Sequence, residues 1–319
     1  MNNYPIATIL GGGGFIGRYL VRNLTRKNFR CIIPTRNPFT KTYLKTQAPP
    51  GAIEIIKFGQ NNFDEIKNAI ENSDVVINLC GILFENRKQK FNTVHAELPE
   101  SIAKLCKKSD VKKFIHVSAI GANKDSKSKY QQSKFLGEEK ALNNFDKTVI
   151  IRPSVVIGNE DNFTNLFAKL SLSPIIPVVN TSYKLEPIFV NDVAKAILKA
   201  IETKNNEGKI YELGGGRVIS FGDMIKLILK IIGKKRIVAE VPMPLAKIQG
   251  SLLSLLPIDP VITKDQCIIL SEKDNVVSGD HLTLEDLKIK PSDIEKEMET
   301  WLFRYAAGGE FSRNKNKTA

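Results

Sequence analysis

Tyr130 and Lys134 are the side chains of this 319-residue sequence best suited to acid–base chemistry. They lie four positions apart in the stretch YQQSK, which places both on one face of a helix. A neighbouring ammonium group lowers the pKa of a phenol from its usual value of about 10, so that the phenol can exchange a proton with a carbonyl or an alcohol. No other tyrosine of the chain has a lysine four positions later. If the protein is an enzyme, we predict that these two residues form its proton-transfer pair.

A run of four glycines near the start of the chain is suited to binding a phosphate group. Within LGGGGFIGRYL, residues 10–20, Gly12, Gly14 and Gly17 satisfy G-x-G-x-x-G, and Gly11 with the latter two satisfies G-x-x-G-x-x-G. Glycine has no Cβ that would hold a ligand away from the N–H groups at a helix N-terminus. A flexible turn is the alternative. The β-forming run PIATIL before the glycines and the helical spacing of apolar residues after them favour a dinucleotide site.

A serine or threonine hydroxyl just beyond the strand that precedes Tyr130 is the third catalytic group expected of such a site. Ser118 is the only nearby candidate. Ala119 and Ile120 occupy the following positions, where reductases of the extended type commonly carry this hydroxyl, and both are apolar. The sequence therefore leaves open whether the catalytic set is complete.

The end of the second predicted strand, CIIPTRNP, indicates which nucleotide is preferred. A carboxylate at this point would hold the ribose hydroxyls of NAD, whereas an arginine accommodates a 2′-phosphate. Arg36 lies there without a neighbouring carboxylate, and Arg18 follows the last glycine of the motif. Because two guanidinium groups can each bind a phosphate in bidentate fashion, we predict NADPH rather than NADH. The alternative is that both arginines are surface charges.

Short apolar runs predict the strands that must position these residues, at residues 5–10, 30–36, 51–59, 74–81, 111–119 and 147–158. Amphipathic segments between the runs predict alternating helices. Strands that are apolar throughout are typical of a parallel sheet that is buried on both faces. The predicted fold is therefore α/β, a Rossmann-like doubly wound parallel sheet with a smaller, mainly helical C-terminal lobe.

The pattern of elements predicts a division of the chain. Residues 1–158 form the nucleotide-binding domain, and residues 159–304 form the smaller lobe, from which about 186–215 return to the first domain. Residues 305–319 are basic and are expected to be disordered.

A surplus of positive charge favours an acidic partner. The chain has 47 Lys and Arg against 34 Asp and Glu, a net charge of +13. The charge would suit an acidic protein, an anionic membrane surface or nucleic acid, and it singles out none of them. Among these partners we do not expect nucleic acid. The basic residues gather in small clusters, which we interpret as solvated faces or as a docking surface; they are Lys107, Lys108, Lys112 and Lys113, then Lys234, Lys235 and Arg236, and the tail SRNKNKTA.

Metal binding and disulfide bonding are not indicated. The four cysteines are far apart without C-x-x-C spacing, and His95, His116 and His281 are isolated from one another. His116 lies in the apolar run KFIHVSA, which predicts a hydrogen-bonded core histidine. The scattered cysteines fit a reducing compartment.

We expect neither a signal or transit peptide, because the first predicted strand begins within a few residues of Met1, nor a membrane span, because no apolar run approaches about 20 residues.

The motifs together resemble an atypical short-chain dehydrogenase/reductase of the epimerase/dehydratase type. Within that superfamily the chain is most similar to the NADPH-binding accessory subunits of respiratory complex I, NADH:ubiquinone oxidoreductase. The likeness covers nearly the whole chain through GGGGFIGRYLV, IIPTR, VVINLCG, FIHVSA, IIRPSVVIGNEDNF, PIFVNDVAKAI and SLLSLLPIDPVITKDQ. The last of these is the most specific, because epimerases in general share only the earlier motifs.

This resemblance implies a bound NADPH with a structural role, and partners among the subunits of complex I. It implies a peripheral position near the quinone site, on the inner face of the energy-transducing membrane, which is cytoplasmic in a bacterium and the matrix side in a mitochondrion. Peripheral contact with the membrane is part of the same expectation. The cofactor-binding residues it implies are Gly11, Gly14, Phe15, Ile16, Gly17, Arg18, Arg36, Cys80, Gly81, Ser118, Tyr130, Lys134 and Pro153.

Two other functions stay open at this point. An oxidoreductase or a nucleotide-sugar epimerase or dehydratase would use Tyr130 and Lys134 for proton transfer, with Ser118 as the third group. A sensor of the nucleotide ratio would use the same fold without chemistry. Fold alone does not decide among them.

Overall fold

The computed structural model describes residues 4–59, 63–245 and 262–309, and the chain divides into two compact units. The first unit comprises Met1–Pro153, Val190–Leu213 and Ser278–Lys290. The second unit comprises Ser154–Phe189, Gly214–Val277 and Pro291–Ala319. Residues 251–261 of the stretch SLLSLLPIDPVITKDQ lie outside the described residues, and so do residues 310–319 of the predicted basic tail.

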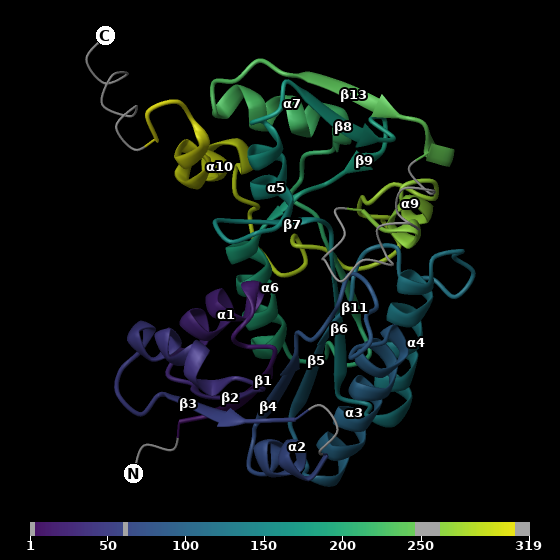
Figure 1. Ribbon diagram of the computed structural model, residues 1–319. Helices are drawn as coiled ribbons and strands as arrows, with labels where there is room; N and C mark the ends of the chain where they lie inside the picture. The colour runs from purple at the N-terminus through teal and green to yellow at the C-terminus, as the bar shows by residue number, and fades with distance from the viewer. Residues whose placement is uncertain (1–3, 60–62, 246–261, 310–319) are drawn as a thin grey trace. The chain divides into compact units, whose positions relative to one another are not determined.

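The first unit is built on a seven-stranded parallel sheet in the order β11-β6-β5-β4-β1-β2-β3 (Figure 1). This arrangement confirms the predicted doubly wound α/β class. The order reverses between β1 and β4, and in open α/β sheets ligands bind outside the carboxyl ends of the strands at such a point. The strands are β1 (Ile6–Leu10), β2 (Arg30–Thr35), β3 (Ile53–Lys57), β4 (Val75–Asn78), β5 (Lys113–Val117), β6 (Thr148–Pro153) and β11 (Ile210–Leu213).

Helices cover both faces of this sheet (Figure 1). On one face α1 (Phe15–Arg26) packs against α6 (Val190–Glu202). On the other, α3 (Leu98–Lys108) packs against α2 (Phe63–Ile70) and α4 (Lys129–Asn144). Helix α1 buries the apolar stripe Leu20, Val21 and Leu24.

A π-helix, η2 (Asn92–Glu97), precedes α3 and approaches α4 unusually closely. A Cβ atom on Gly137 of α4 would overlap the carbonyl oxygen of His95, so only glycine allows this approach. π-Helical turns are frequent at functional sites. The close packing brings the side chain of His95 to the N-terminal part of α4.

A buried ion network joins three elements of the first unit. Arg152 of β6 binds Glu138 of α4 with two hydrogen bonds, Nε to Oε1 at 2.9 Å and Nη2 to Oε2 at 2.7 Å. Its Nη1 lies 3.4 Å from Oε1 of Glu212 on β11 and 3.1 Å from Nε2 of His281. The backbone N–H of Ser278 donates to the other oxygen of Glu212 at 2.8 Å. Residues 278–290 are thereby fastened to the sheet.

Lys113 departs from the expectation of a solvated or docking cluster. Its side chain is buried, and its ammonium group donates to the carbonyl oxygens of Ala200 and Thr203 and to Oδ1 of Asn206. These groups lie at the carboxyl end of α6, where orphan carbonyls and the helix dipole favour a cation. The prediction for Lys113 was wrong because the sequence does not show that a helix end lies against it.

The second unit combines helices with three pairs of short strands. The pairs are β7 (Val156–Ile157) with β10 (Ile188–Phe189), β9 (Lys184–Leu185) with β12 (Ile219–Ser220), and β8 (Ile175–Val179) with β13 (Ile237–Val241). The helices are α5 (Phe163–Leu170), α7 (Phe221–Ile231), α9 (Lys264–Ile269) and α10 (Ile294–Leu302), and the short 3₁₀ turn Phe303–Tyr305 follows.

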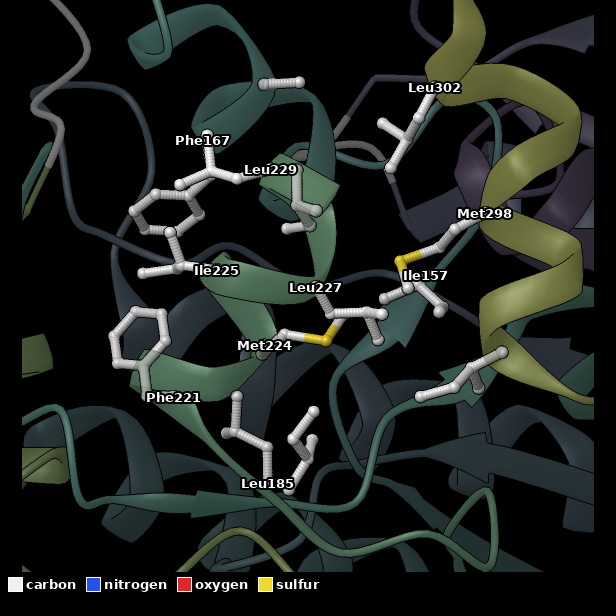
Figure 2. Close-up of a cluster of buried hydrophobic side chains, with 14 of the residues drawn as sticks. Ile157, Phe167, Leu185, Phe221, Met224, Ile225, Leu227, Leu229, Met298 and Leu302 are labelled. Carbon is white, nitrogen blue, oxygen red and sulfur yellow. The ribbon is translucent and has the colours of Figure 1, made fainter. Parts of the chain in front are cut away.

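The core of the second unit lies between α5, α7, α10 and β8. Figure 2 shows Met224, Leu227 and Met298 pointing toward one another in it. The indole N–H of Trp301 donates to Oγ1 of Thr164 at 3.2 Å, so its one polar atom is satisfied. In the described part of the chain, no helix combines the length and the apolar character that crossing a membrane requires.

Candidate cofactor site

The glycine loop between β1 and α1 is closely packed. Gly11 has φ +79°, which favours glycine, and its carbonyl accepts from the backbone N–H of Gly14 at 2.9 Å. A Cβ atom on Gly17 would overlap the carbonyl oxygen of Gly12, so the first turn of α1 lies directly on the loop. Close packing of the loop against α1 is therefore one reason for these glycines, beside the space that they leave for a ligand.

The N-terminus of α1 has open backbone donors. Its N-cap is Gly14, no side chain caps the helix, and no acidic residue occupies the first turn, which contains Phe15 and Ile16. A Cβ atom on Gly14 would have only the carbonyl oxygen of Gly11 nearby, at 3.1 Å. Uncapped N–H groups together with the helix dipole attract an anion, so the loop fits the diphosphate of a dinucleotide.

Cationic side chains gather beside this loop. The guanidinium of Arg18 lies over the ring of Tyr43 at 5.2 Å, and the hydroxyl of Tyr43 donates to the carbonyl of Gly13 at 3.2 Å. The aliphatic chain of Lys41 packs on Gly13, while Arg36 is exposed just beyond β2. Lys41 and Tyr43 were missed in the sequence, because they belong to the 3₁₀ segment Pro38–Gln47, whose return to the loop leaves no periodic signal.

The end of β4 lies against the end of β1. A Cβ atom on Gly11 would be 3.2 Å from the backbone nitrogen of Cys80, so these two loops touch. Burial raises the pKa of the Cys80 thiol to about 11, and the positive charges of Arg36 and Lys134 oppose that rise. The positive charges of Arg36 and Lys134 therefore both lie close enough to the Cys80 thiol to affect its pKa. The thiol is protonated at neutral pH and is not a nucleophile.

Lys134 of α4 is buried, and its ammonium group lies at the carboxyl end of β5. Its ammonium group donates to the carbonyl oxygen of Val117 at 2.9 Å and would lie 3.9 Å from a Cβ atom on Gly81. Burial lowers the pKa of Lys134 to about 8, against the opposing effect of the Glu138 carboxylate. An amine that titrates near neutral pH can take part in proton transfer as well as hold a hydroxyl.

Two buried polar atoms beside Lys134 lack hydrogen-bond partners among the residues that the structure describes. They are Oγ of Ser118 and Nε2 of His116. Because Nδ1 of His116 accepts from the side-chain amide of Asn78 at 3.2 Å, its proton lies on Nε2. The prediction of a fully satisfied core histidine thus holds for only one ring nitrogen. Buried donors of this kind are costly unless a ligand or water meets them.

Pro153 joins the same edge of the sheet through the backbone, since its carbonyl accepts from the N–H of Ile120 at 3.1 Å. The structure thus brings the predicted residues to the carboxyl ends of β1, β2, β4, β5 and β6 and to the facing turns of α1 and α4. Tyr130 is not hydrogen-bonded to Ser118 here, because that hydroxyl has no partner among the described residues.

The ring of Tyr130 packs edge-on against Phe91 and His95, at centroid distances of 5.8 and 5.3 Å. Nε2 of His95 accepts from the backbone N–H of Ile82 at 3.0 Å, and Nδ1 donates to Oγ of Ser133 at 2.9 Å. That hydroxyl in turn donates to the carbonyl of Tyr130 at 2.7 Å. His95 therefore ties the loop after β4 to the turn that carries Tyr130. It looked isolated in the sequence because only the packing of η2 on α4 creates these contacts.

Both buried histidines should make the folded state sensitive to acid. Burial lowers the pKa of His95 to about 3 and that of His116 well below its usual 6.5. As pH falls below 6.5 the unfolded chain gains protons that the folded chain does not bind. Stability present above pH 6.5 is therefore lost on acidification, by about 2 kcal/mol for His95 between pH 7 and pH 5, and His116 adds to this loss. Urea unfolding at both pH values measures the loss, and His95→Gln should remove the part that belongs to His95; an unchanged pH dependence in this variant would contradict the assignment.

No group of three His, Cys, Asp or Glu side chains able to hold a metal ion occurs in residues 4–59, 63–245 and 262–309. The donors that converge here are N–H, hydroxyl and ammonium groups, which suit phosphate and ribose oxygens.

Comparison with known proteins gives concordant results. A model of the NAD dependent epimerase/dehydratase family matches residues 7–214. The mouse (Mus musculus) protein named NADH dehydrogenase [ubiquinone] 1 alpha subcomplex subunit 9, mitochondrial, is 33% identical over 293 residues, which is 91% of this chain and 78% of that protein. The NADH-ubiquinone oxidoreductase 40 kDa subunit, mitochondrial, of Neurospora crassa is 31% identical over 288 residues, covering 90% and 76%.

Among solved structures, UDP-glucuronic acid 4-epimerase from Bacillus cereus, in complex with NAD, is similar with a TM-score of 0.63. It is 21% identical, and the match covers 74% of this chain and 87% of that one. At this identity the likeness concerns the fold.

Proposed function

The chain belongs to the NAD-dependent epimerase/dehydratase family, and from this membership we propose that it is an NADPH-binding accessory subunit of a respiratory NADH:ubiquinone oxidoreductase, with a mainly structural cofactor. The observation that carries the proposal is the extent of the likeness. The family model ends at residue 214, whereas relatives named as subunits of that enzyme match about 90% of the chain. Their similarity therefore includes much of the second unit, which the general family pattern does not explain.

The nucleotide assignment rests on the cations beside the glycine loop. The uncapped N-terminus of α1 would hold the diphosphate, and Arg18, Arg36 and Lys41 would surround a 2′-phosphate. Lys134 and Ser118 would meet the ribose and nicotinamide end of the cofactor, whose chemistry when bound is hydride transfer. Ser118 would then gain the partner that it lacks among the described residues.

Arg36→Glu should remove most of the preference for NADPH over NADH. The substitution replaces a charge-assisted hydrogen bond with repulsion, which costs NADPH about 1.5–3 kcal/mol, or roughly 10- to 150-fold in affinity, and spares NADH. Calorimetric titration with both nucleotides measures the ratio. Arg26→Glu, in the last turn of α1, changes the net charge equally and should leave the ratio unchanged. Equal affinities in the unsubstituted protein would overturn the assignment.

We place the protein on the inner face of the energy-transducing membrane, where such a subunit would meet its partners. The test is purification of the tagged full-length chain from membranes solubilised in mild detergent. Subunits of complex I should co-purify with it. A soluble homo-oligomer without any of them would contradict the proposed function.

A second candidate is an oxidoreductase or nucleotide-sugar epimerase, and the environment of Lys134 favours it. A buried ammonium group with a pKa of about 8, near an unpartnered serine hydroxyl, is suited to proton transfer with Tyr130. Against it, Ala119 and Ile120 offer no hydroxyl at the next positions.

Tyr130→Phe separates the two candidates, because it keeps the ring contacts and removes the hydroxyl. In an accessory subunit the variant should retain NADPH with a loss of about 1 kcal/mol at most, and should still support assembly of complex I. In an enzyme, turnover should fall by about 100-fold or more while the cofactor stays bound. NADPH oxidation with a panel of carbonyl and nucleotide-sugar substrates, beside assembly in cells that carry only the variant, measures both. Robust turnover that vanishes in the variant would defeat the structural role.

A further inference from the structure

The outer face of the parallel pair β8 and β13 in the second unit is apolar. In this pair Ile175 lies opposite Ile237 and Pro177 opposite Ala239. Ile176 and Val178, which alternate with them along β8, point into the core. Aliphatic side chains that gather on a solvent-exposed surface mark an interaction site more often than a scattered exposed residue does. Here Ile237 is 65% exposed and Ile175 is 49% exposed.

The segment before β8 extends this apolar surface. Leu172 is 82% exposed, more than any other leucine or isoleucine among the residues that the structure describes. The N–H of Ile237 donates to the carbonyl of Pro174 at 3.1 Å, and Nε of Arg236 donates to that of Ser171 at 2.8 Å. The two segments therefore lie side by side, as β8 and β13 do in Figure 1. We name Leu172, Pro174, Ile175 and Ile237 the aliphatic patch.

Basic side chains outnumber acidic ones around the aliphatic patch. Residues 162–185 and 224–239 contain no Asp or Glu, and the next residue of β13, Glu240, accepts a hydrogen bond from Oγ1 of Thr181 at 2.6 Å. Lys226 and Lys230, farther along α7, are engaged with Asp223 and Glu295. Within the described part of the chain, no carboxylate pairs with the basic groups nearest the patch, which are Lys169, Lys234, Lys235 and Arg236.

We infer that the aliphatic patch and its basic rim dock on an anionic lipid surface. Exposed aliphatic side chains enter the boundary between headgroups and acyl chains, and lysine and arginine beside them are attracted to anionic headgroups. A nucleic acid would use the cations but gain nothing from Leu172 and Ile237. This inference deepens the peripheral location in the proposed function by naming the surface that meets the membrane.

Vesicle flotation of the full-length chain tests the inference. The protein should float with phosphatidylcholine vesicles that contain phosphatidylglycerol, bind phosphatidylcholine alone much more weakly, and dissociate in high salt. Lys169→Gln with Lys235→Gln should lower the partition coefficient about 30-fold, since each removed charge accounts for about 1 kcal/mol near the surface. Leu172→Ser with Ile237→Ser should lower it at least about 10-fold.

Matched controls keep the result specific. Val218→Ser changes an aliphatic residue that is 54% exposed elsewhere in the same unit, and Lys226→Gln with Lys230→Gln removes two charges that are already paired. Val218→Ser should leave flotation unchanged, the Lys226 and Lys230 variant should lower it less than the Lys169 and Lys235 variant does, and Lys315→Gln with Lys317→Gln should not abolish it. No binding, equal binding to neutral vesicles, or binding that the patch variants retain would overturn the inference. The inference would also be overturned if the unsubstituted protein did not float and the patch variants no longer co-purified with subunits of complex I. In that case the patch would bind a protein. Co-purification in the absence of flotation would leave the proposed function standing.

Discussion

Gly14→Val should abolish the rise in melting temperature that NADPH gives the unsubstituted protein. A ligand that binds only the folded state stabilises it in proportion to the logarithm of its concentration. A valine at the N-cap of α1 would put its methyl groups where the diphosphate must approach the helix N–H groups, so affinity should fall by about 100-fold or more. Melting curves over a series of NADPH concentrations measure the loss.

The folded state should tolerate this change. Gly14 has φ −87°, which other residues adopt, and only one atom would crowd its Cβ. The melting temperature without nucleotide should therefore stay close to that of the unsubstituted chain, and Gly14→Ala should give an intermediate loss of affinity. A folded valine variant that NADPH still stabilises would show that the loop does not bind the cofactor.

Arg152→Met should lower the free energy of unfolding by about 3–5 kcal/mol. The substitution keeps most of the volume but leaves the carboxylates of Glu138 and Glu212 buried without their shared cation. Urea denaturation at pH 7 measures the effect. Breaking a buried pair costs more than the pair contributes, because the remaining charge has lost both water and partner.

The combination of Arg152→Met with Glu138→Gln is the control, because it removes one buried charge and should recover part of the lost stability. The difference in stability between the single variant and the unsubstituted protein should also shrink as the solution is acidified toward the carboxylate range, because an unpaired buried carboxylate has a raised pKa and takes up a proton in the folded state first. A loss below about 1 kcal/mol would indicate that water reaches the network.

Apolar patterning was enough to predict six of the seven strands in the sheet of the first unit; β11 was not among the predicted runs. The runs at 74–81 and 111–119 are apolar because β4 and β5 are buried on both faces, so the pattern reports the layer directly. The run 147–158 was predicted as one strand, and this was wrong. It divides at Ser154, whose hydroxyl donates to the side chain of Asn275, and the residues beyond it pair with β10. Because Asn275 lies 121 positions away from Ser154, the residues around Ser154 do not predict this contact.

The candidate site was predictable where it depends on backbone and not where it depends on packing. Gly11, Gly14 and Gly17 carry their own signal, because a helix N-terminus must approach a loop closely. The contacts of His95 and Tyr43 arise when η2 meets α4 and when residues 38–47 return to the loop. The periodicity of one element cannot predict such contacts, because they depend on how that element packs against another one.

The first unit is discontinuous in the chain, and this has a consequence for biosynthesis. The chain passes from one unit to the other after residues 153, 189, 213, 277 and 290. When the first 153 residues have left the ribosome, β6 has no neighbour on its outer edge, and Arg152 holds Glu138 but lacks Glu212 and His281. At about 5–20 residues per second the sheet waits several seconds or more for β11 and residues 278–290. During this interval an unpaired strand edge is open to other nascent chains, so we expect the growing polypeptide to depend on chaperones until almost all of it has been translated.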